Sequence, residues 1–253
     1  MKEDKYYIGG RKVILDALKA NKPIQKIYLQ FGSEGPEIRE IEQLARRKKI
    51  PVTRTDKLKF NKLSKLKNPQ GILGLLRLSN MMDMNVFLDV HLPKLVEAGQ
   101  SVLVYADRFN DPHNLGALIR TAEILRADAV CFPIKDSSPI SPGVIKASMG
   151  AATQIPLIMV TTPFNFLEQL KQFGFHLIAA QKNSASIPVW DYHFPPFSCV
   201  IIGNEESGVK YSFTKLIDQF VHIPQHGRTE SFNASVAGGI LLYEIDRQKT
   251  TAS

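Results

Sequence analysis

Six short apolar runs in the last 150 or so residues constrain the fold most. They occupy residues 102–106, 129–133, 156–160, 176–180, 199–203 and 220–224. Helical patterns lie between several of them, including residues 115–125 and 164–173. Alternation of apolar strands with helices predicts a mostly parallel sheet that is covered on both faces. Ligands of such sheets bind beyond the carboxyl ends of the strands, so we expect the functional site there.

The first 80 residues predict a separate, smaller α/β unit. Helical patterns cover residues 10–20, 36–49 and 57–65, and strand patterns cover residues 26–30, 51–53 and 71–78. Residues 80–85 are polar and rich in Met without clear periodicity. We therefore expect three parts: residues 1–80 as one domain, residues 81–98 as a linker that contains a short helix, and residues 99–253 as a second domain.

Positive charge is concentrated in the first of these parts. Residues 1–80 contain 19 Lys and Arg against 8 Asp and Glu, a net charge of +11. Residues 81–253 contain 13 against 16, a net charge of −3. Neutralising phosphates releases counterions, so a polyanion such as nucleic acid is a plausible partner of residues 1–80. The alternative is a solvated face on a small helical domain.

The composition fits a soluble globular protein, with 44% hydrophobic residues among 253. Cys131 and Cys199 lie in apolar runs, which predicts small buried thiols rather than ligands or nucleophiles. No apolar stretch approaches the ~20 residues that span a membrane, and the start MKEDKYYIGG does not resemble a secretory signal. We expect a cytoplasmic protein with no membrane partner.

Three polar loops follow predicted strands. Asn114 precedes an apolar helical stripe, so by itself it is interpreted as a helix N-cap. Gly203 and Gly208 flank a carboxylate and would let the backbone approach a ligand, although the spacing is not that of a phosphate loop. The third loop, SFNAS at residues 231–235, would offer donors to a polar ligand just before a helix. The histidines show no metal-ligand spacing, which favours metal-independent chemistry.

Taken in this order, the segments YADRFNDPHNLGALIRTAEIL, VIIGNEESGV and IPQHGRTESFNASVAGGILLYE resemble the three signature motifs of the SpoU-type ribose 2′-O-methyltransferases, which belong to the knotted SPOUT superfamily. GRKVILDAL, NPQGILGLL and IKASMGAATQIPL also look like members of this family that carry an N-terminal RNA-binding domain. The resemblance implies an α/β protein with a trefoil-knotted, parallel-sheet methyltransferase domain after a small α/β RNA-binding domain.

The resemblance also implies site residues. Those carried over as catalytic are Arg120, Asn114, Glu205, Ser231 and Asn233, and those carried over as cofactor-binding are Gly203, Ile223, Gln225 and Phe232. The chain departs from the family pattern, which more often has Met at the position of Gln225, Leu at Phe232 and Val at Ala234. Arg120 is the family's candidate for handling the proton of the hydroxyl. Because a neutral guanidine is costly, Arg120 could instead orient the RNA phosphate or stabilise developing negative charge.

The function that the resemblance implies is methylation of a ribose 2′-hydroxyl in structured RNA with S-adenosylmethionine as the cofactor. Ribosomal RNA is the preferred substrate, with transfer RNA as the alternative. A noncatalytic RNA-binding or ribosome-assembly protein on the same fold is a second alternative, against which the intact motif residues argue. A homodimer is also implied, since in this family the partner subunit borders the cofactor pocket.

Overall fold

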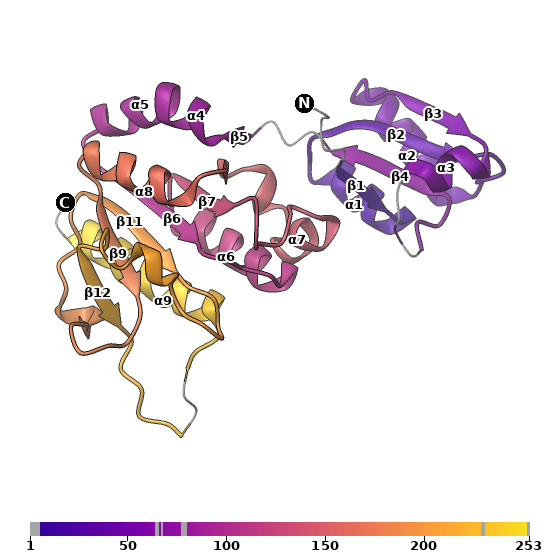
Figure 1. Ribbon diagram of the computed structural model, residues 1–253. Helices are drawn as coiled ribbons and strands as arrows, with labels where there is room; N and C mark the ends of the chain where they lie inside the picture. Colours follow the sequence, from indigo (N-terminus) through magenta and orange to yellow (C-terminus); the bar gives the residue numbers. More distant parts are fainter. Residues whose placement is uncertain (1–5, 64–65, 67, 77–79, 229–230, 252–253) are drawn as a thin grey trace. The chain divides into compact units, whose positions relative to one another are not determined.

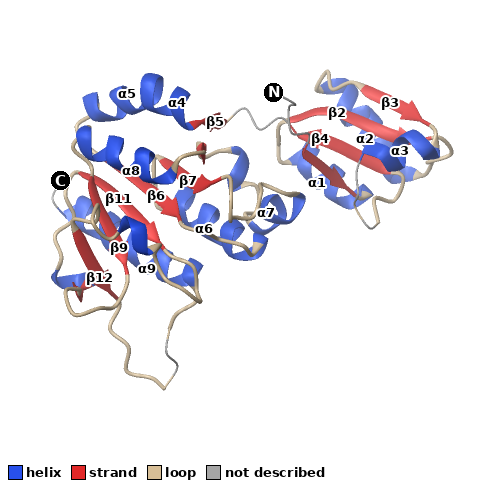
Figure 2. Ribbon diagram, in the orientation of Figure 1, coloured by secondary structure: helices blue, strands red, loops and turns tan. Residues whose placement is uncertain are grey.

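The computed structural model describes residues 6–63, 66, 68–76, 80–228 and 231–251, and it separates the chain into two compact units, Met1–Ser79 and Asn80–Ser253. Figure 1 traces the chain through both units and Figure 2 shows their helices and strands. Each unit has its own sheet.

The first unit is a four-stranded mixed sheet with helices on both faces. The strand order is β1-β4-β2-β3, in which β4 is antiparallel to β1 and β2, and β3 is parallel to β2. Helices α1 and α2 pack together over one face, and α3 covers the other through Phe60, which contacts Tyr7 and Leu73. The elements are β1 (Tyr6–Gly9), α1 (Arg11–Lys19), β2 (Ile24–Gln30), α2 (Pro36–Arg47), β3 (Val52–Thr55), α3 (Lys57–Leu63) and β4 (Ile72–Leu76).

The central strand β4 shows why this sheet needs glycine. All five of its residues are buried. A side chain at Gly74 would begin 2.7 Å from Cδ1 of Ile14 in α1, so the absence of one lets the helix lie close to the sheet. The predicted helices and strands of residues 10–76 all appear in the structure, and β1 is an additional strand that the sequence patterns did not predict. Parts of the predicted segments 57–65 and 71–78 fall outside the described residues.

The second unit is an eight-stranded sheet in the order β10-β12-β9-β11-β6-β7-β8-β5, and every pair in it is parallel. The prediction of a parallel sheet is therefore confirmed. Its strands are β5 (Met81–Asp83), β6 (Ser101–Ala106), β7 (Ala129–Pro133), β8 (Leu157–Val160), β9 (His176–Ala180), β10 (Ile187–Pro188), β11 (Phe197–Ile202) and β12 (Gln219–His222). The threading that would make a trefoil knot stays a prediction.

Helices cover both faces of this sheet. One face packs against α6 (Pro112–Ile124) and α9 (Ala234–Thr251), and α6 also packs against α7 (Pro142–Ala147). The other face packs against α8 (Pro163–Gln172) and the helical segment formed by α4 (Met84–Val86), η1 (Phe87–His91) and α5 (Leu92–Glu97). Short turns of helix complete the unit: η2 (Ala151–Thr153), η3 (Val189–Asp191) and η4 (Tyr211–Phe213).

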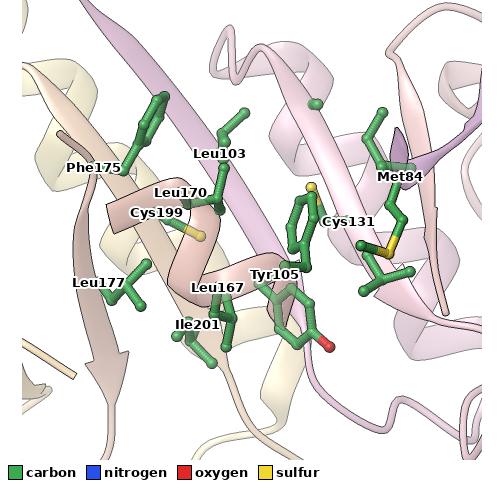
Figure 3. Packing of buried hydrophobic residues seen from close by; sticks show 14 of the residues in the cluster. Met84, Leu103, Tyr105, Cys131, Leu167, Leu170, Phe175, Leu177, Cys199 and Ile201 are labelled. Atoms are coloured by element: carbon green, nitrogen blue, oxygen red, sulfur yellow. The ribbon is translucent and has the colours of Figure 1, made fainter. Parts of the chain in front are cut away.

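In the core on the α8 side of the sheet, alternate residues of a strand point towards the helices of that face. Leu103 and Tyr105 of β6 point towards α8, where Leu167 and Leu170 meet them (Figure 3). Cys131 and Cys199 lie in the same cluster as free, fully buried thiols, and burial raises the pKa of each above its ordinary value. The prediction of small buried thiols is confirmed.

The prediction that residues 81–98 form a linker is wrong, although the short helix expected within them is present. Met81–Asp83 pairs with β8 at the edge of the large sheet, and the helical segment that follows buries Met84, Phe87, Leu88 and Leu92 in the core. The polar and Met-rich composition misled the prediction, because an edge strand of three residues is too short to show periodicity. No described helix is long and apolar enough to cross a membrane.

Candidate active site

Three loops meet at the carboxyl edge of the large sheet. One joins β6 to α6, the second is a tight turn after β11, and the third leads from β12 into α9. Since all these strands are parallel, their carboxyl ends lie at the same edge, and loops far apart in the sequence can make one site.

The carboxylate of Glu205 joins the three loops. Its Oε1 accepts hydrogen bonds from Nδ2 of Asn114 at 3.0 Å, from Nδ2 of Asn233 at 2.5 Å and from the backbone N–H of Ala234 at 3.1 Å. Asn233 Nδ2 also donates to Oδ1 of Asn114 at 2.9 Å. The carboxylate also lies at the N-terminus of α9, where unpaired backbone N–H groups favour negative charge. Asn114, Glu205 and Asn233, which we call the amide–carboxylate cluster, therefore hold the three loops together.

The two asparagines have different local roles. Asn233 is the N-cap of α9, because its Oδ1 accepts from the backbone N–H of Ser235 at 3.0 Å and of Val236 at 3.3 Å. The interpretation of Asn114 as an N-cap is wrong, since Asp111 caps α6 by accepting from the N–H of His113 at 3.0 Å. Asn114 stands inside the first turn instead, which leaves its side chain free to reach Glu205.

The turn after β11 depends on a glycine for steric reasons. Asn204 and Gly208 exchange backbone hydrogen bonds of 3.1 and 2.9 Å across it. A Cβ on Gly203 would lie 2.2 Å from the carbonyl carbon of Gly208 and 2.4 Å from the N of Val209, both of them backbone atoms that cannot move aside. Gly208 itself has a φ of 62°, the left-handed region that favours glycine. The turn therefore tolerates no side chain at Gly203, whatever binds there.

A second network, which sequence reasoning missed, fastens this turn to the β6–α6 loop. Arg108 donates from Nε to Asp107 at 3.2 Å and from Nη2 to the carbonyl of Gly208 at 2.8 Å, and Asn204 donates to the carbonyl of Arg108 at 3.0 Å. Asp107 also accepts from the N–H of Lys210 at 2.8 Å. Burial raises the pKa of Asp107 above its ordinary value, against the effect of these donors. Asp107 and Arg108 lie within the segment that resembles the first motif, but no pattern in the sequence linked them to the turn.

A cavity of about 200 Å³, which we call the β12 cavity, opens between the ends of β9, β11 and β12 and the start of α9. All four predicted cofactor-binding residues line it, together with Glu205 and Ser231. Its wall is apolar over much of its extent, with polar groups of the turn on one side. Other lining residues, to which the sequence analysis gave no role in the site, include Gln181, Lys182, Ile202, His222, Ala237 and Leu241. The residues after β9 were missed because they belong to none of the three motifs.

A second cavity of about 180 Å³, the α6 cavity, lies on the other side of the cluster. It shares Asn204, Glu205 and Ala234 with the β12 cavity, and the rest of its wall consists of Phe109, Asn110, Asp111, Asn114 and Glu206. Glu205 therefore stands between two neighbouring cavities. One is largely apolar and the other is lined mainly by amides and carboxylates.

Arg120 is the predicted site residue that the fold does not bring into this cluster. It is exposed on the third turn of α6, it lines neither cavity, and it has no hydrogen bond or ion pair with the residues that the structure describes. Its catalytic role stays a prediction, as do the roles of the other site residues. Within the described ranges, no group of three His, Cys, Asp or Glu side chains could hold a metal ion.

Comparisons with known proteins identify both units. Residues 101–243 match the SpoU rRNA Methylase family, and residues 7–82 match the RNA 2′-O ribose methyltransferase substrate binding domain. A candidate TrmH family tRNA/rRNA methyltransferase of Staphylococcus aureus is 32% identical over 245 residues, which covers 96% of each chain. A relative from Staphylococcus haemolyticus with the same description is 30% identical, over 96% of this chain and 95% of its own.

Two solved structures have the same fold. The AdoMet-bound rRNA methyltransferase from Sinorhizobium meliloti superposes with a TM-score of 0.71 at 23% identity, over 96% of this chain and 87% of its own. The SpoU methyltransferase AviRb from Streptomyces viridochromogenes, in complex with AdoMet, gives 0.72 at 21% identity, over 98% of this chain and 91% of its own. The family matches cover both units and the relatives cover nearly the whole chain, so this chain belongs to the SpoU rRNA Methylase family of RNA methyltransferases.

Proposed function

We propose that this protein transfers a methyl group from S-adenosylmethionine to a ribose 2′-hydroxyl of ribosomal RNA. The observation that carries the proposal is the amide–carboxylate cluster, which joins all three motif loops between an apolar cavity and a polar one. The family's solved members named above bind AdoMet, and the family is described as acting on rRNA. Transfer RNA is the alternative substrate, since the curated relatives are named for both.

The β12 cavity fits the cofactor by its chemistry. Ile202, Ile223 and Leu241 offer an apolar wall for a nucleoside base, and the backbone of Gly203 can approach a ligand closely because it has no side chain. Phe232, where the family more often has Leu, is partly exposed at the cavity and would lie along the base. When bound, S-adenosylmethionine supplies a methyl group that its sulfonium already activates for displacement.

The chain's own task is then alignment. The α6 cavity would take the ribose of the target nucleotide, with the amides of Asn110 and Asn114 placed to hold its hydroxyl groups. Glu205 and Asn233 would fix Asn114 in that orientation, since each is bonded to it. Ser231 lines the β12 cavity and would contact the cofactor or the ribose. Holding both reactants in line removes much of the entropic cost of bringing them together.

Arg120 would act on the site of a second subunit. It is exposed and lies outside both cavities of its own chain. The same two helices also expose apolar side chains, which are Ile124 of α6 and Val236 and Tyr243 of α9. Helices α6 and α9 pack together, with Gly239 of α9 next to Thr121 of α6. An isologous homodimer through α6 and α9 would cover these apolar residues and carry Arg120 to the partner. A cytoplasmic location is part of the same proposal, since the RNA lies there.

The first experiment tests the activity itself. Purified protein should bind S-adenosylmethionine in calorimetry and should transfer a labelled methyl group to rRNA, and mapping of 2′-O-methyl positions in cells with and without the protein should reveal a missing position. Activity should survive a chelator, because the chemistry is proposed to need no metal. Failure to bind the cofactor, with or without RNA, would favour a noncatalytic RNA-binding protein. If the 2′-O-methyl position that is lost without the protein lies in tRNA and none is lost in rRNA, the substrate is tRNA.

A second experiment tests the shared site. Arg120→Ala and Glu205→Ala should each be inactive alone. In a statistical mixture about half of the dimers carry one chain of each kind, and each of these has one intact site only if Arg120 acts across the interface. The mixture should then regain about a quarter of the wild-type activity. A mixture as inactive as the single variants would show that Arg120 acts within its own chain or not at all.

A further inference from the structure

A third cavity of the methyltransferase unit lies away from the amide–carboxylate cluster. It has a volume of about 120 Å³ and opens at the carboxyl ends of β6, β7 and β8, so we call it the β8 cavity. Strands β6, β7 and β8 are neighbours in the sheet, and a different loop follows each of them into the wall. The wall contains Asp107, Arg108, Pro133, Lys135, Asp136, Val160, Thr161, Pro163, Lys210 and Phe213.

Three cations from three separate loops reach this cavity: Arg108, Lys135 and Lys210. Two carboxylates face them. Asp107 is buried and is engaged by Nε of Arg108 and the N–H of Lys210, and Asp136 is exposed. Lys135 and Lys210 are exposed residues that form no ion pair with any described residue, and Nζ of Lys210 lies over the ring of Phe213, 6.0 Å from its centroid. Positive charge at the opening of the cavity is therefore only partly balanced, in a unit whose sequence carries a net charge of −3 over residues 81–253.

Exposed apolar side chains flank the same cavity. Tyr211 is 88% exposed and stands between the lining residues Lys210 and Phe213 in the turn η4. Ile134 and Phe164 are also exposed, and each is adjacent in sequence to a lining residue. Cations beside exposed rings are typical of surfaces that bind single-stranded nucleic acid, because the cations contact phosphates and the rings stack on bases.

The β8 cavity is separated from the β12 cavity by one turn of chain. Gly208 lines the β12 cavity, and its carbonyl accepts from Arg108, which lines the β8 cavity. The bond between Asp107 and the N–H of Lys210 fixes the start of η4 to the same point. A strand whose target nucleotide lies at the amide–carboxylate cluster would thus have its neighbouring nucleotides within reach of Lys210 and Tyr211.

We propose that the β8 cavity and Tyr211 bind an unpaired RNA segment next to the target nucleotide. Arg108, Lys135 and Lys210 contact its phosphates, and the ring of Tyr211 stacks on a base. The inference rests on the proposed function, because it takes RNA as the substrate. It adds a contact on the methyltransferase unit that is separate from the substrate-binding domain.

The test uses the full-length protein and a fluorescein-labelled single-stranded oligoribonucleotide of eight nucleotides, with binding followed by anisotropy at several salt concentrations. Tyr211→Ala should weaken binding roughly five-fold or more, as expected for loss of one stacked base. Lys135→Ala combined with Lys210→Ala should reduce the slope of log affinity against log salt by about one to two, since two phosphate contacts are lost. Matched controls are Phe173→Ala, a partly exposed ring near the amino end of β9, and Lys94→Ala on α5, which should change neither quantity.

A photoreactive oligonucleotide gives the location independently of affinity. An octamer that contains 4-thiouridine should crosslink to η4 or to the loops after β6 and β7, as read by mass spectrometry. Crosslinks confined to residues 1–79, or affinities and salt slopes of the variants equal to those of the wild type, would overturn the proposal. Calorimetry of each variant with S-adenosylmethionine separates the RNA-binding proposal from the proposed function. Loss of the RNA site should leave cofactor binding intact. A protein that binds no cofactor would instead contradict the proposed function.

Discussion

Replacement of Glu205 by alanine is the change that tests the site most directly. Oε1 of Glu205 accepts three N–H donors, at 3.0, 2.5 and 3.1 Å, from two different loops. Hydrogen bonds to a charged group contribute ~1.5 to 3 kcal/mol each when they are shielded from water. Glu205 is exposed, so water can replace much of each bond, and we discount the contribution to roughly 0.5 to 0.8 kcal/mol per donor. The sum is a loss of about 2 kcal/mol for Glu205→Ala.

The loss should appear locally, at the start of α9. The N–H of Ala234 donates to Glu205, and the N–H groups of Ser235 and Val236 donate to Asn233, whose amide Glu205 holds. Native-state hydrogen exchange of these three amides measures the free energy of opening this turn. A change of about 2 kcal/mol corresponds to exchange about 30-fold faster. Glu205→Gln keeps an acceptor without the charge and should lose about half as much free energy.

Glu206→Ala is the matched control. It removes the carboxylate at the next position, which is exposed and accepts no hydrogen bond from the described residues. Hydrogen exchange of the first amides of α9 should therefore stay within a factor of about three of the wild-type rate. A double-mutant cycle with Asn114→Ala should give a coupling of about 0.5 to 1 kcal/mol with Glu205→Ala. Unchanged exchange in Glu205→Ala would show that the cluster is a surface contact that does not hold the three loops together.

Three further predictions concern packing and burial. Gly116→Ala should destabilise the protein by about 2 kcal/mol in chemical unfolding, since the new Cβ would lie 2.5 Å from Cβ of Ala147. Gly239→Ala should change stability by less than about 1 kcal/mol, because its new Cβ would lie 3.3 Å from a methyl group of Thr121. Equal effects of the two substitutions would contradict this reasoning. Tyr105→Phe should leave stability unchanged or raise it by about 1 kcal/mol, because the buried hydroxyl has no hydrogen-bond partner among the described residues; a larger loss would reveal such a partner. Burial raises the pKa of Asp107 above 3.8, so the folded protein binds the proton of this carboxyl group more tightly than the unfolded chain does, and the free energy of unfolding falls as pH rises through the raised pKa. Unfolding measured between pH 4 and 7 should therefore show the wild type losing stability relative to Asp107→Asn. Curves of stability against pH that run parallel for the two proteins would contradict this.

The sequence predicted the central strands well because their apolar runs are continuous. β7 and β9 begin and end at the predicted residues, and β6, β8, β11 and β12 differ by one or two. Strands buried on both faces are built mainly from apolar residues, although Ser101 and Ser198 are buried in β6 and β11, so a continuous apolar run marks each strand. The short edge strands β5 and β10 were not predicted, since three and two residues carry no periodic signal.

The site was predicted only through the resemblance. No local pattern indicates that Asn114, Glu205 and Asn233 touch, because 91 and 119 residues separate Asn114 from its two partners. The order of the strands in the sheet brings these residues into contact, and the spacing of residues along the sequence does not predict that order. The same reason explains why the N-cap of α6 was assigned wrongly. Asp111 and Asn114 are both good capping residues, and only the position of Glu205 shows which of them is engaged elsewhere.

Two features of the site support the homodimer that we propose. The β12 cavity, at about 200 Å³, is smaller than the ~300 to 1,000 Å³ of usual small-molecule sites, so one chain would enclose only part of a nucleoside-sized cofactor. Arg120 is exposed and unpaired among the described residues, although the motif that contains it supplies Asn114 to the cluster. A homodimer through α6 and α9 would account for both features, because the partner would close the cavity and bring a cation to it. The amide–carboxylate cluster needs no partner, since all of its bonds lie within one chain. We therefore expect a monomeric variant to keep the cluster and its hydrogen-exchange protection but to lose methyl transfer.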